Sequence, residues 1–246
     1  MSSVAIYSLK GGVGKSTFAV NLAYRSARAS ARRTLLWDID AQGAAGFLIK
    51  LEGRSGDAHK VFSRDLQPGQ LASATEFVNL DLLAADISLR RLDVQLVDAD
   101  ARKRLRKLLR TLDEDYDRII LDCPPGLTEV SEQVFRAVDL IVIPVAPSPL
   151  AMRAYEDVVA HIRGLHRDGP EILPVLSMVD GRKKLHREMV AANPDWHRIP
   201  QASVVERMSV ERAPLATFAG QHPSVQAFAD LWADIETRLL SLEARH

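Results

Sequence analysis

A stretch rich in glycine and lysine near the start of the chain constrains the fold more than any other feature. It reads Lys10-Gly11-Gly12-Val13-Gly14-Lys15-Ser16-Thr17, directly after an apolar run at residues 4–8 and directly before a helical pattern. Glycines let backbone N–H groups turn toward a phosphate, and the positive end of the following helix dipole points at the same anion. The stretch therefore predicts a strand, a phosphate-binding loop and a helix, in that order.

Side chains of this loop carry the chemistry expected of a nucleotide site. Lys15 would neutralise charge on the β- and γ-phosphates, and the Ser16 hydroxyl would ligate Mg²⁺. The general pattern G-x-x-x-x-G-K-[ST] fails because Leu9 stands where it requires glycine, whereas a deviant form with an additional lysine at Lys10 fits throughout. A dinucleotide-binding pattern fails because Thr17 stands where it requires its last glycine. We expect ATP and Mg²⁺ as the cofactors.

Short β-rich runs alternate with longer amphipathic segments along the chain. The predicted strands cover residues 4–8, 34–37, 80–84, 119–121, 140–144 and 172–178. Between two of them, leucines recur at helical spacing from Leu105 to Leu112. This alternation predicts an α/β fold with a doubly wound, mostly parallel sheet and helices on both faces, as in P-loop NTPases. The polar stretch from residue 53 to residue 69 is predicted to be a surface excursion.

Composition limits the other possibilities. Hydrophobic residues make up 47% of the 246 residues and no Pro/Gly/Ser-rich linker divides them, so we expect residues 1–246 to form a single domain. The lone cysteine, Cys123, is expected to serve packing only, and no apolar run approaches the roughly 20 residues that span a bilayer. We therefore expect a cytoplasmic protein without stable membrane insertion. Basic and acidic residues each number 32, so any attraction to DNA must come from a local patch.

Two further motifs extend the similarity of the loop to a known family. The second predicted strand runs into Asp38-Ile39-Asp40-Ala41-Gln42-Gly43, and the strand at 118–122 ends in Asp122-Cys123-Pro124-Pro125-Gly126. With the loop, they resemble the ParA/MinD branch of deviant Walker A P-loop ATPases, except that Ala41 replaces the usual proline. The resemblance implies that Asp40 orients the attacking water, that Asp38 supports the hydration shell of Mg²⁺, and that Asp122 holds the ion through water or Ser16. Plain surface charge is the alternative for Asp38 and Asp40.

The resemblance continues through the second half of the chain. Residues 147–158 and 176–187 are similar to segments of ParA proteins. In that family, the strand end that corresponds to Met178 and the loop that corresponds to Pro200 flank the adenine. The implied base contacts are Met178 and Pro200. In the family, the extra lysine crosses a dimer interface to the partner's phosphates, which implies that role for Lys10. A solvated lysine at the rim of its own site is the alternative.

Two clusters of basic residues are candidates for DNA contact. The cluster at 102–110 surrounds leucines at helical spacing and is flanked by acidic residues, which is typical of a solvated helix face. The cluster at 182–187 resembles the ParA region that binds DNA without sequence preference, although residues 201–208 match the family's basic loop poorly. The predicted DNA contacts are Arg182, Lys183, Lys184, Arg187, Arg207 and Arg212.

The resemblance implies an ATPase that positions a cargo. ATP would close a homodimer that binds DNA non-specifically, and a ParB-like or analogous partner would stimulate slow hydrolysis and release. We expect a nucleoid-associated protein without an N-terminal helix-turn-helix. A MinD-like membrane cycle is the runner-up, although the predicted C-terminal helix at 225–242 combines an apolar core stripe with acidic residues that disfavour a membrane surface. A DNA-binding scaffold with a vestigial nucleotide site is the third possibility.

Overall fold

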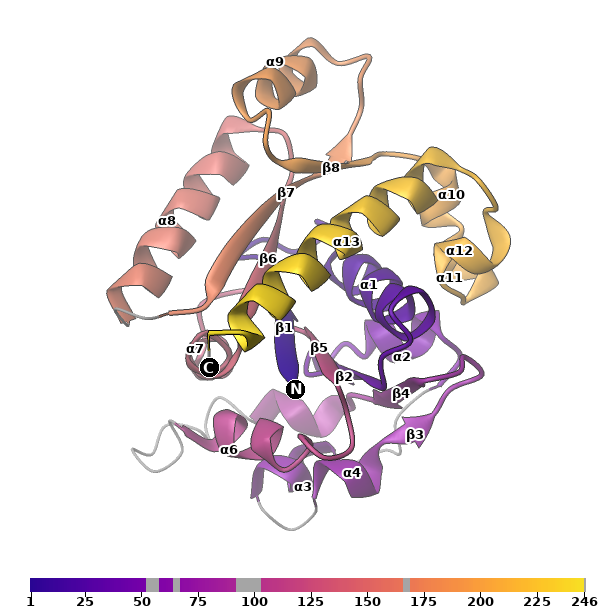
Figure 1. Ribbon diagram of the computed structural model, residues 1–246. Helices are drawn as coiled ribbons and strands as arrows, with labels where there is room; N and C mark the ends of the chain where they lie inside the picture. Colours follow the sequence, from indigo (N-terminus) through magenta and orange to yellow (C-terminus); the bar gives the residue numbers. More distant parts are fainter. Residues whose placement is uncertain (52–57, 64–66, 92–102, 166–168, 246) are drawn as a thin grey trace.

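One sheet organises the chain. The computed structural model describes residues 1–51, 58–63, 67–91, 103–165 and 169–245. They form an eight-stranded sheet with the order β3-β4-β2-β5-β1-β6-β7-β8 (Figure 1), parallel except for the β3–β4 pair. The predicted doubly wound, mostly parallel sheet is confirmed. The strands are β1 (Ser2–Ile6), β2 (Thr34–Asp38), β3 (Ser73–Ala74), β4 (Leu80–Leu83), β5 (Arg118–Asp122), β6 (Leu140–Val145), β7 (Glu171–Val179) and β8 (His197–Pro200).

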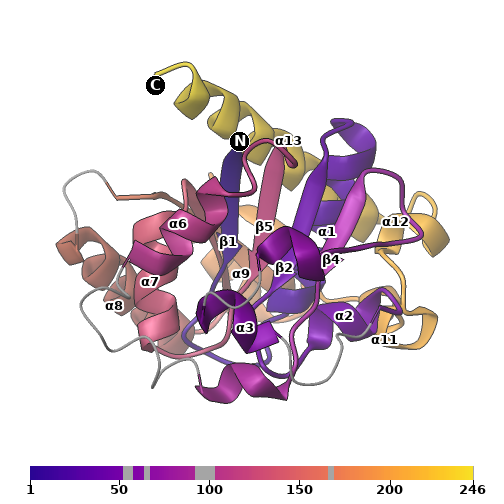
Figure 2. The same ribbon diagram turned by 90° about the horizontal axis from the view of Figure 1, so that it is seen from below.

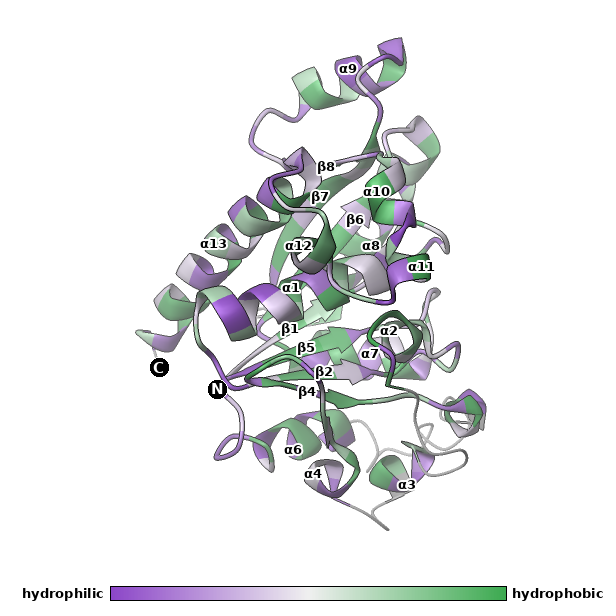
Figure 3. Ribbon diagram, turned by 90° about the vertical axis from the view of Figure 1, so that its right-hand side faces the viewer, coloured by the Kyte–Doolittle hydropathy of each residue, from purple (hydrophilic) through white to green (hydrophobic). Residues whose placement is uncertain are grey.

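Helices cover both faces because side chains along each strand alternate between two cores. On one face, Val4 and Ile6 pack with α1 (Lys15–Ala29), α2 (Ala44–Leu48), α11 (Met208–Glu211), α12 (Leu215–Phe218) and α13 (Pro223–Glu243). On the other face, Ala5 and Tyr7 pack with α3 (Ala58–Ser63), η1 (Ile87–Arg91), α6 (Arg104–Arg110), α7 (Glu129–Ala137) and α8 (Pro149–Leu165). Figure 1 and Figure 3 show the strands between these two layers.

Three further short helices are α4 (Pro68–Leu71), α9 (Lys184–Ala192) and α10 (Ser203–Glu206). Leu71 of α4 packs against one core, and Val204 and Val205 of α10 pack against the other. Helix α9 buries none of its residues and projects beyond the strands between β7 and β8 (Figure 3). None of the described helices is both long and apolar enough to cross a membrane.

Most predicted elements are present. Each predicted strand exists, and its ends differ from the prediction by at most two residues. The short edge strands β3 and β8 were not predicted, because neither contains a run of apolar residues. The surface excursion predicted at 53–69 is wrong for residues 58–63, where Val61 and Phe62 are buried and the Phe62 ring lies 5.8 Å from that of Trp37. Residues 53–57 and 64–66 lie outside the described residues.

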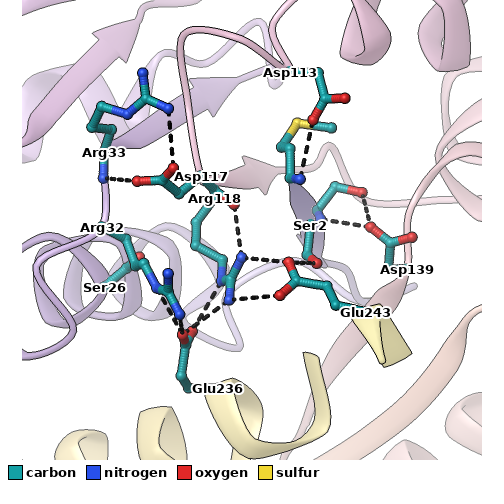
Figure 4. A network of polar contacts seen from close by, with 12 residues as sticks. Ser2, Ser26, Arg32, Arg33, Asp113, Asp117, Arg118, Asp139, Glu236 and Glu243 are labelled. Carbon is teal, nitrogen blue, oxygen red and sulfur yellow. Dashed lines mark hydrogen bonds and ion pairs between the residues drawn. The ribbon is translucent and has the colours of Figure 1, made fainter. Parts of the chain in front are cut away.

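Helix α13 is fastened to the amino ends of the strands. Its predicted core stripe is confirmed, since Phe228, Leu231, Trp232, Ile235 and Leu239 are all buried. Arg118 opens β5, and its guanidinium donates to Glu236 at 2.9 and 3.0 Å and to Glu243 at 2.7 Å (Figure 4). Both chain ends also lie at this edge of the sheet (Figure 2). The amino edge thus holds a buried charge that the protein itself compensates.

Candidate nucleotide-binding site

The predicted phosphate loop connects the end of β1 to the start of α1. Gly12 and Gly14 have φ angles of 74° and 91°, a left-handed conformation that residues with a Cβ rarely adopt. Gly14 is the N-cap of α1. No described side chain caps the first turn of α1, and that turn contains no acidic residue. The first N–H groups of α1 and the positive end of its dipole are therefore available to an anion.

The loop is braced by contacts within the chain. The carbonyl oxygen of Val13 accepts a hydrogen bond from Ser177 Oγ of β7 at 2.8 Å. The Phe18 N–H donates to the carbonyl oxygen of Gly14 at 2.9 Å, which closes the first turn of α1. The side chain of Lys15 is only 7% exposed. A preformed loop reduces the entropy lost on binding a phosphate.

Two buried carboxylates lie at the carboxyl ends of neighbouring strands. Asp38 of β2 and Asp122 of β5 are opposite each other in register, and both are fully buried. The Asp38 carboxylate accepts hydrogen bonds from the N–H groups of Asp40 and Ala45, each at 3.1 Å. Burial and the neighbouring charge of Asp122 raise the pKa of Asp38 well above its ordinary value. The pair is thus costly to ionise without a cation.

The Asp122 carboxyl accepts fewer hydrogen bonds than the Asp38 carboxyl. Neither of its oxygens accepts a hydrogen bond of normal geometry from any described residue. Burial raises the pKa of Asp122 to about 7, although Ser16 and Lys15 lie close enough to lower it. A buried carboxyl with unused oxygens beside a hydroxyl is the donor set that a hydrated Mg²⁺ requires, so these residues fit the predicted ion.

A magnesium ion here would not be enclosed by protein ligands. Among the described residues, no group of three or more His, Cys, Asp or Glu side chains is placed to hold a metal ion. Mg²⁺ normally keeps several waters and binds one or two carboxylates together with substrate phosphates. The sparse donor set of Ser16, Asp38 and Asp122 therefore suits an ion that arrives with a nucleotide.

The predicted switch segment lies beside these carboxylates. Asp40 is half-buried in the loop between β2 and α2, and its carboxylate accepts a hydrogen bond from the Gln42 N–H at 3.0 Å. Its carbonyl oxygen accepts another from the Gly43 N–H at 2.9 Å. Gly43 has a φ of 65° and begins α2. Ala41, which replaces the family's proline, packs against the core. The turn forms without the proline.

The predicted base contacts are brought together with the loop. Met178 at the end of β7 and Pro200 at the end of β8 line one pocket of about 70 Å³ with Gly14 and Thr17. Sequence reasoning missed other residues of the wall, because no motif marks the segment after β8. The remaining lining residues are Phe18, Ser177, Ile199, Gln201, Ala202, Val205, Glu206 and Phe228.

Lys10 lies at the opposite rim of the loop. Its side chain is half-buried and lines a small pocket with Pro144, Val145 and Tyr155. Within the described part of the chain, its ammonium group forms no hydrogen bond or ion pair. The geometry leaves the Lys10 ammonium available to another molecule.

Sequence comparison agrees with this geometry. Residues 1–174 match the family model described as an AAA domain. The chain is 36% identical over 194 residues to the chromosome partitioning protein ParA of Myxococcus xanthus. The aligned region covers 76% of this chain and 68% of that protein. The chain belongs to the ParA family of P-loop ATPases.

Solved structures show the same fold at lower sequence identity. A variant of McdA from Cyanothece, in complex with ATP, superposes on this ParA-family chain with a TM-score of 0.85 at 20% identity and covers 96% of both chains. MinD from Pyrococcus horikoshii, the septum site-determining protein solved with Mg-ADP, gives a TM-score of 0.78 at 22% identity and covers 95% of both.

In this ParA-family protein, several of the predicted DNA contacts near α9 are engaged within the chain. Arg182 donates to both carboxylate oxygens of Asp180, each at 2.9 Å, and these bonds lower the pKa of Asp180. Arg187 donates to the carbonyl oxygens of Gly181 at 3.0 Å and Arg182 at 2.9 Å. Lys184 Nζ lies 3.6 Å from Glu188 Oε1. Lys183 is exposed and forms no ion pair with a described residue.

The two predicted contacts after β8 also have partners. Arg207 pairs with Glu211 one turn along and lies 5.8 Å from the centre of the Phe218 ring. Arg212 donates from Nε to the carbonyl oxygen of Phe47 at 2.8 Å, and its guanidinium lies 4.6 Å from the centre of the Phe47 ring. Arg212 thus reaches helix α2, which follows the predicted switch segment, a contact that the sequence did not indicate.

The cluster on α6 differs from the one near α9. Lys103, Arg106, Lys107 and Arg110 are exposed, and none forms an ion pair or side-chain hydrogen bond with a described residue. The leucines at 105, 108 and 109 are buried beneath them. The predicted solvated helix face is therefore confirmed for residues 103–110, and Arg102 lies outside the described residues.

Proposed function

We propose that this protein hydrolyses ATP to ADP and phosphate slowly, and that the cycle partitions or positions a cargo such as a plasmid, a chromosome or a protein assembly. The observation that carries the proposal is the unbonded Asp122 carboxyl, buried beside a braced phosphate loop. A carboxyl that served only the core would be paired or hydrogen-bonded, because burial without a partner costs several kcal/mol. A cation–phosphate ligand offsets that cost.

Each site residue has a separate task in this proposal. The backbone N–H groups of residues 11–17 and the Lys15 ammonium bind the phosphates. A hydrated Mg²⁺, held by Ser16, Asp38 and Asp122, would neutralise charge that develops on them. Asp40 accepts a hydrogen bond from the attacking water and orients it. Met178 and Pro200 hold the base on its two sides.

The proposed cycle includes an ATP-dependent homodimer. Lys10 would cross the interface and stabilise charge on the partner's phosphates, as an arginine finger does. The unbonded Lys10 ammonium supports this role, because no described group of its own subunit holds it away from a partner's phosphates. Hydrolysis would then require the dimer, which a ParB-like or analogous partner would activate.

The proposed DNA contact is non-specific and occurs in the cytoplasm, on the nucleoid. Lys183 is available directly, whereas Lys184 and Arg207 would exchange an exposed glutamate partner for a DNA phosphate. Exposed ion pairs contribute little to stability, so that exchange costs little. Arg182 would have to leave Asp180, whose side chain is only 11% exposed. The free cations of α6 give the competing surface. Charge reversal at Lys183 and Lys184 should therefore weaken DNA binding more than reversal at Arg106 and Lys107, and the opposite order in a salt titration would move the DNA face to α6.

Nucleotide binding and turnover of two variants test the proposal. Lys15→Ala should lose ATP binding by calorimetry. Asp40→Ala should keep ATP binding but lose hydrolysis by about a hundredfold or more, because only water positioning is removed. In light scattering, Lys10→Ala should bind ATP and stay monomeric. Unchanged ATP affinity in Lys15→Ala would overturn the nucleotide site, and wild-type turnover in Asp40→Ala would remove Asp40 from catalysis.

A further inference from the structure

We infer that Arg212 is a positioning residue, which couples the wall of the base pocket to the switch segment that carries Asp40. The inference rests on the proposed function, because that function gives Asp40 its role. It adds a second role for Arg212 that needs no DNA. The link is built from contacts between elements far apart in the sequence, and it has two halves that meet at Arg212.

The first half joins Arg212 to Phe47 of α2. The Arg212 side chain makes two contacts with this residue, a hydrogen bond of 2.8 Å to its carbonyl oxygen and a cation–π contact of 4.6 Å with its ring. Phe47 is 43% exposed, so Arg212 covers a ring that the core does not bury. Helices α2 and α11 lie side by side in all ribbon views (Figure 1, Figure 2, Figure 3).

A short series of hydrogen bonds continues from Phe47 to Asp40. The Phe47 N–H donates to the carbonyl oxygen of Gly43 at 3.1 Å, and the Gly43 N–H donates to that of Asp40 at 2.9 Å. Helix α2 has only five residues, and a helix of that length depends on tertiary contacts for its stability. Loss of the Arg212 contact should therefore loosen α2 and let Asp40 move.

The second half joins Arg212 to the base pocket. The Arg212 N–H donates to the carbonyl oxygen of Met208 at 2.8 Å, and Met208 Sδ lies 3.2 Å from Asn21 Nδ2 of α1. The same amide nitrogen donates to the carbonyl oxygen of Thr17 at 2.8 Å. Thr17 lines the base pocket, as do Val205 and Glu206 just before α11. A base bound in this pocket would therefore contact the elements that hold Arg212.

Arg33 provides a control for this link, because it is an exposed arginine with no role in the proposed site. Its guanidinium pairs with Asp117 at 3.1 Å and donates to the carbonyl oxygen of Glu114 at 2.8 Å, so neither contact reaches α2. Replacing Arg33 removes the same charge and leaves the switch segment bonded.

ATP hydrolysis without DNA tests the catalytic side of the inference. Arg212→Ala should lower kcat by about tenfold while KM for ATP stays within about twofold, because the phosphate cradle remains intact. Arg212→Lys keeps the charge but cannot cover the ring and donate along the same plane, so it should recover only part of kcat. Arg33→Ala should match the wild type. A normal kcat in Arg212→Ala, beside an active wild type, would overturn the inference.

Hydrogen–deuterium exchange tests the physical link without any turnover. In the nucleotide-free protein, the amides of Gly43 and Phe47 should exchange faster in Arg212→Ala than in the wild type or in Arg33→Ala. Equal exchange in all three proteins would overturn the link. If the wild type hydrolyses no ATP, the proposed function fails, while the exchange result still decides whether Arg212 holds α2. Arg212→Lys serves both measurements if Arg212→Ala does not fold.

Discussion

The two ends of strand β5 carry buried charges that the protein treats in opposite ways. Arg118 begins the strand and is 1% exposed, and Asp122 ends it and is 0% exposed. The Arg118 guanidinium donates to two glutamates of α13, whereas the Asp122 carboxylate accepts no hydrogen bond of normal geometry from a described residue. A buried charge with internal partners serves the fold, and one without them indicates a ligand.

The pKa values of the two groups express the same difference. Burial alone lowers the pKa of Arg118, but hydrogen bonds and charges of Glu236 and Glu243 raise it above its ordinary value, so the charged form is favoured. Burial raises the pKa of Asp122 to about 7, so its charged form is disfavoured. A cation beside Asp122 should lower this pKa and favour the charged form, which ties the charge of Asp122 to ligand binding.

Removal of Arg118 should have the largest effect. Arg118→Ala leaves two glutamates without their shared partner, and we expect it to lower the free energy of unfolding by about 3 kcal/mol in urea denaturation. Arg33→Ala breaks the exposed pair with Asp117 at 3.1 Å and is the control, with no measurable loss expected. Similar stability of both variants would mean that the amino-edge cluster is as dispensable as a surface pair.

Ligand addition should distinguish the carboxyl edge from the amino edge. Mg-ATP at a hundredfold excess over its Kd should raise the free energy of unfolding of the wild type by about 2.7 kcal/mol. Asp122→Asn should gain no more from Mg-ATP than from ATP with a chelator, because its link to the ion is lost. Arg33→Ala should show the full gain. Equal gains in Asp122→Asn and the wild type would remove Asp122 from the ion site.

The two edges should also respond to opposite ends of the pH range. The folded-state pKa of Asp122 is raised. Its contribution to the free energy of unfolding is therefore present at low pH and is lost as pH rises from about 4 to about 7. The pKa of Glu243 is lowered, so its contribution is lost as pH falls through its folded value. Thermal unfolding of the nucleotide-free protein at different pH values should show a loss of stability at both acidic and neutral pH. Asp122→Asn should reduce only the loss between about pH 4 and 7, where the slope is up to about 1.4 kcal/mol per pH unit.

The smallest effect should be a gain in stability. At pH 8 and without nucleotide, Asp122→Asn should raise the free energy of unfolding by about 1 kcal/mol, because it removes a charge that burial disfavours. The same variant should lose Mg-dependent hydrolysis. Denaturation and phosphate release on one preparation check both statements. A variant that is less stable than the wild type at pH 8 would show that the ionised carboxyl is already compensated without a ligand.

The parts that sequence analysis predicted best are those in which neighbouring residues carry the whole signal. The loop from Lys10 to Thr17, the strand ending at Asp122 and the stripe of α13 depend on local spacing, and the structure contains all three. The pocket wall at Val205 and Glu206 and the Arg212–Phe47 contact were not predicted. Phe47 and Arg212 are 165 positions apart, and only the packing of α11 on α2 brings them together.

Ion pairing was equally hard to predict. The arginines near α9 are a basic cluster in the sequence, yet Arg182 is paired with Asp180 in the structure. The basic residues of α6 have acidic neighbours in the sequence, yet those within the described residues are unpaired. Side-chain geometry decides which charges meet, and residue type and spacing alone do not determine it.

The exposure of helix α9 bears on how the sequence of such a protein can diverge. None of its residues is buried, and it is connected to the body by β7, which ends beside Met178, and by β8, which ends at Pro200. The strands therefore fix both proposed base contacts independently of the segment between them. That segment can be shortened, lengthened or replaced by a foreign module without disturbing the nucleotide site. A surface that meets new partners can diverge there while the ATP-binding machinery stays the same.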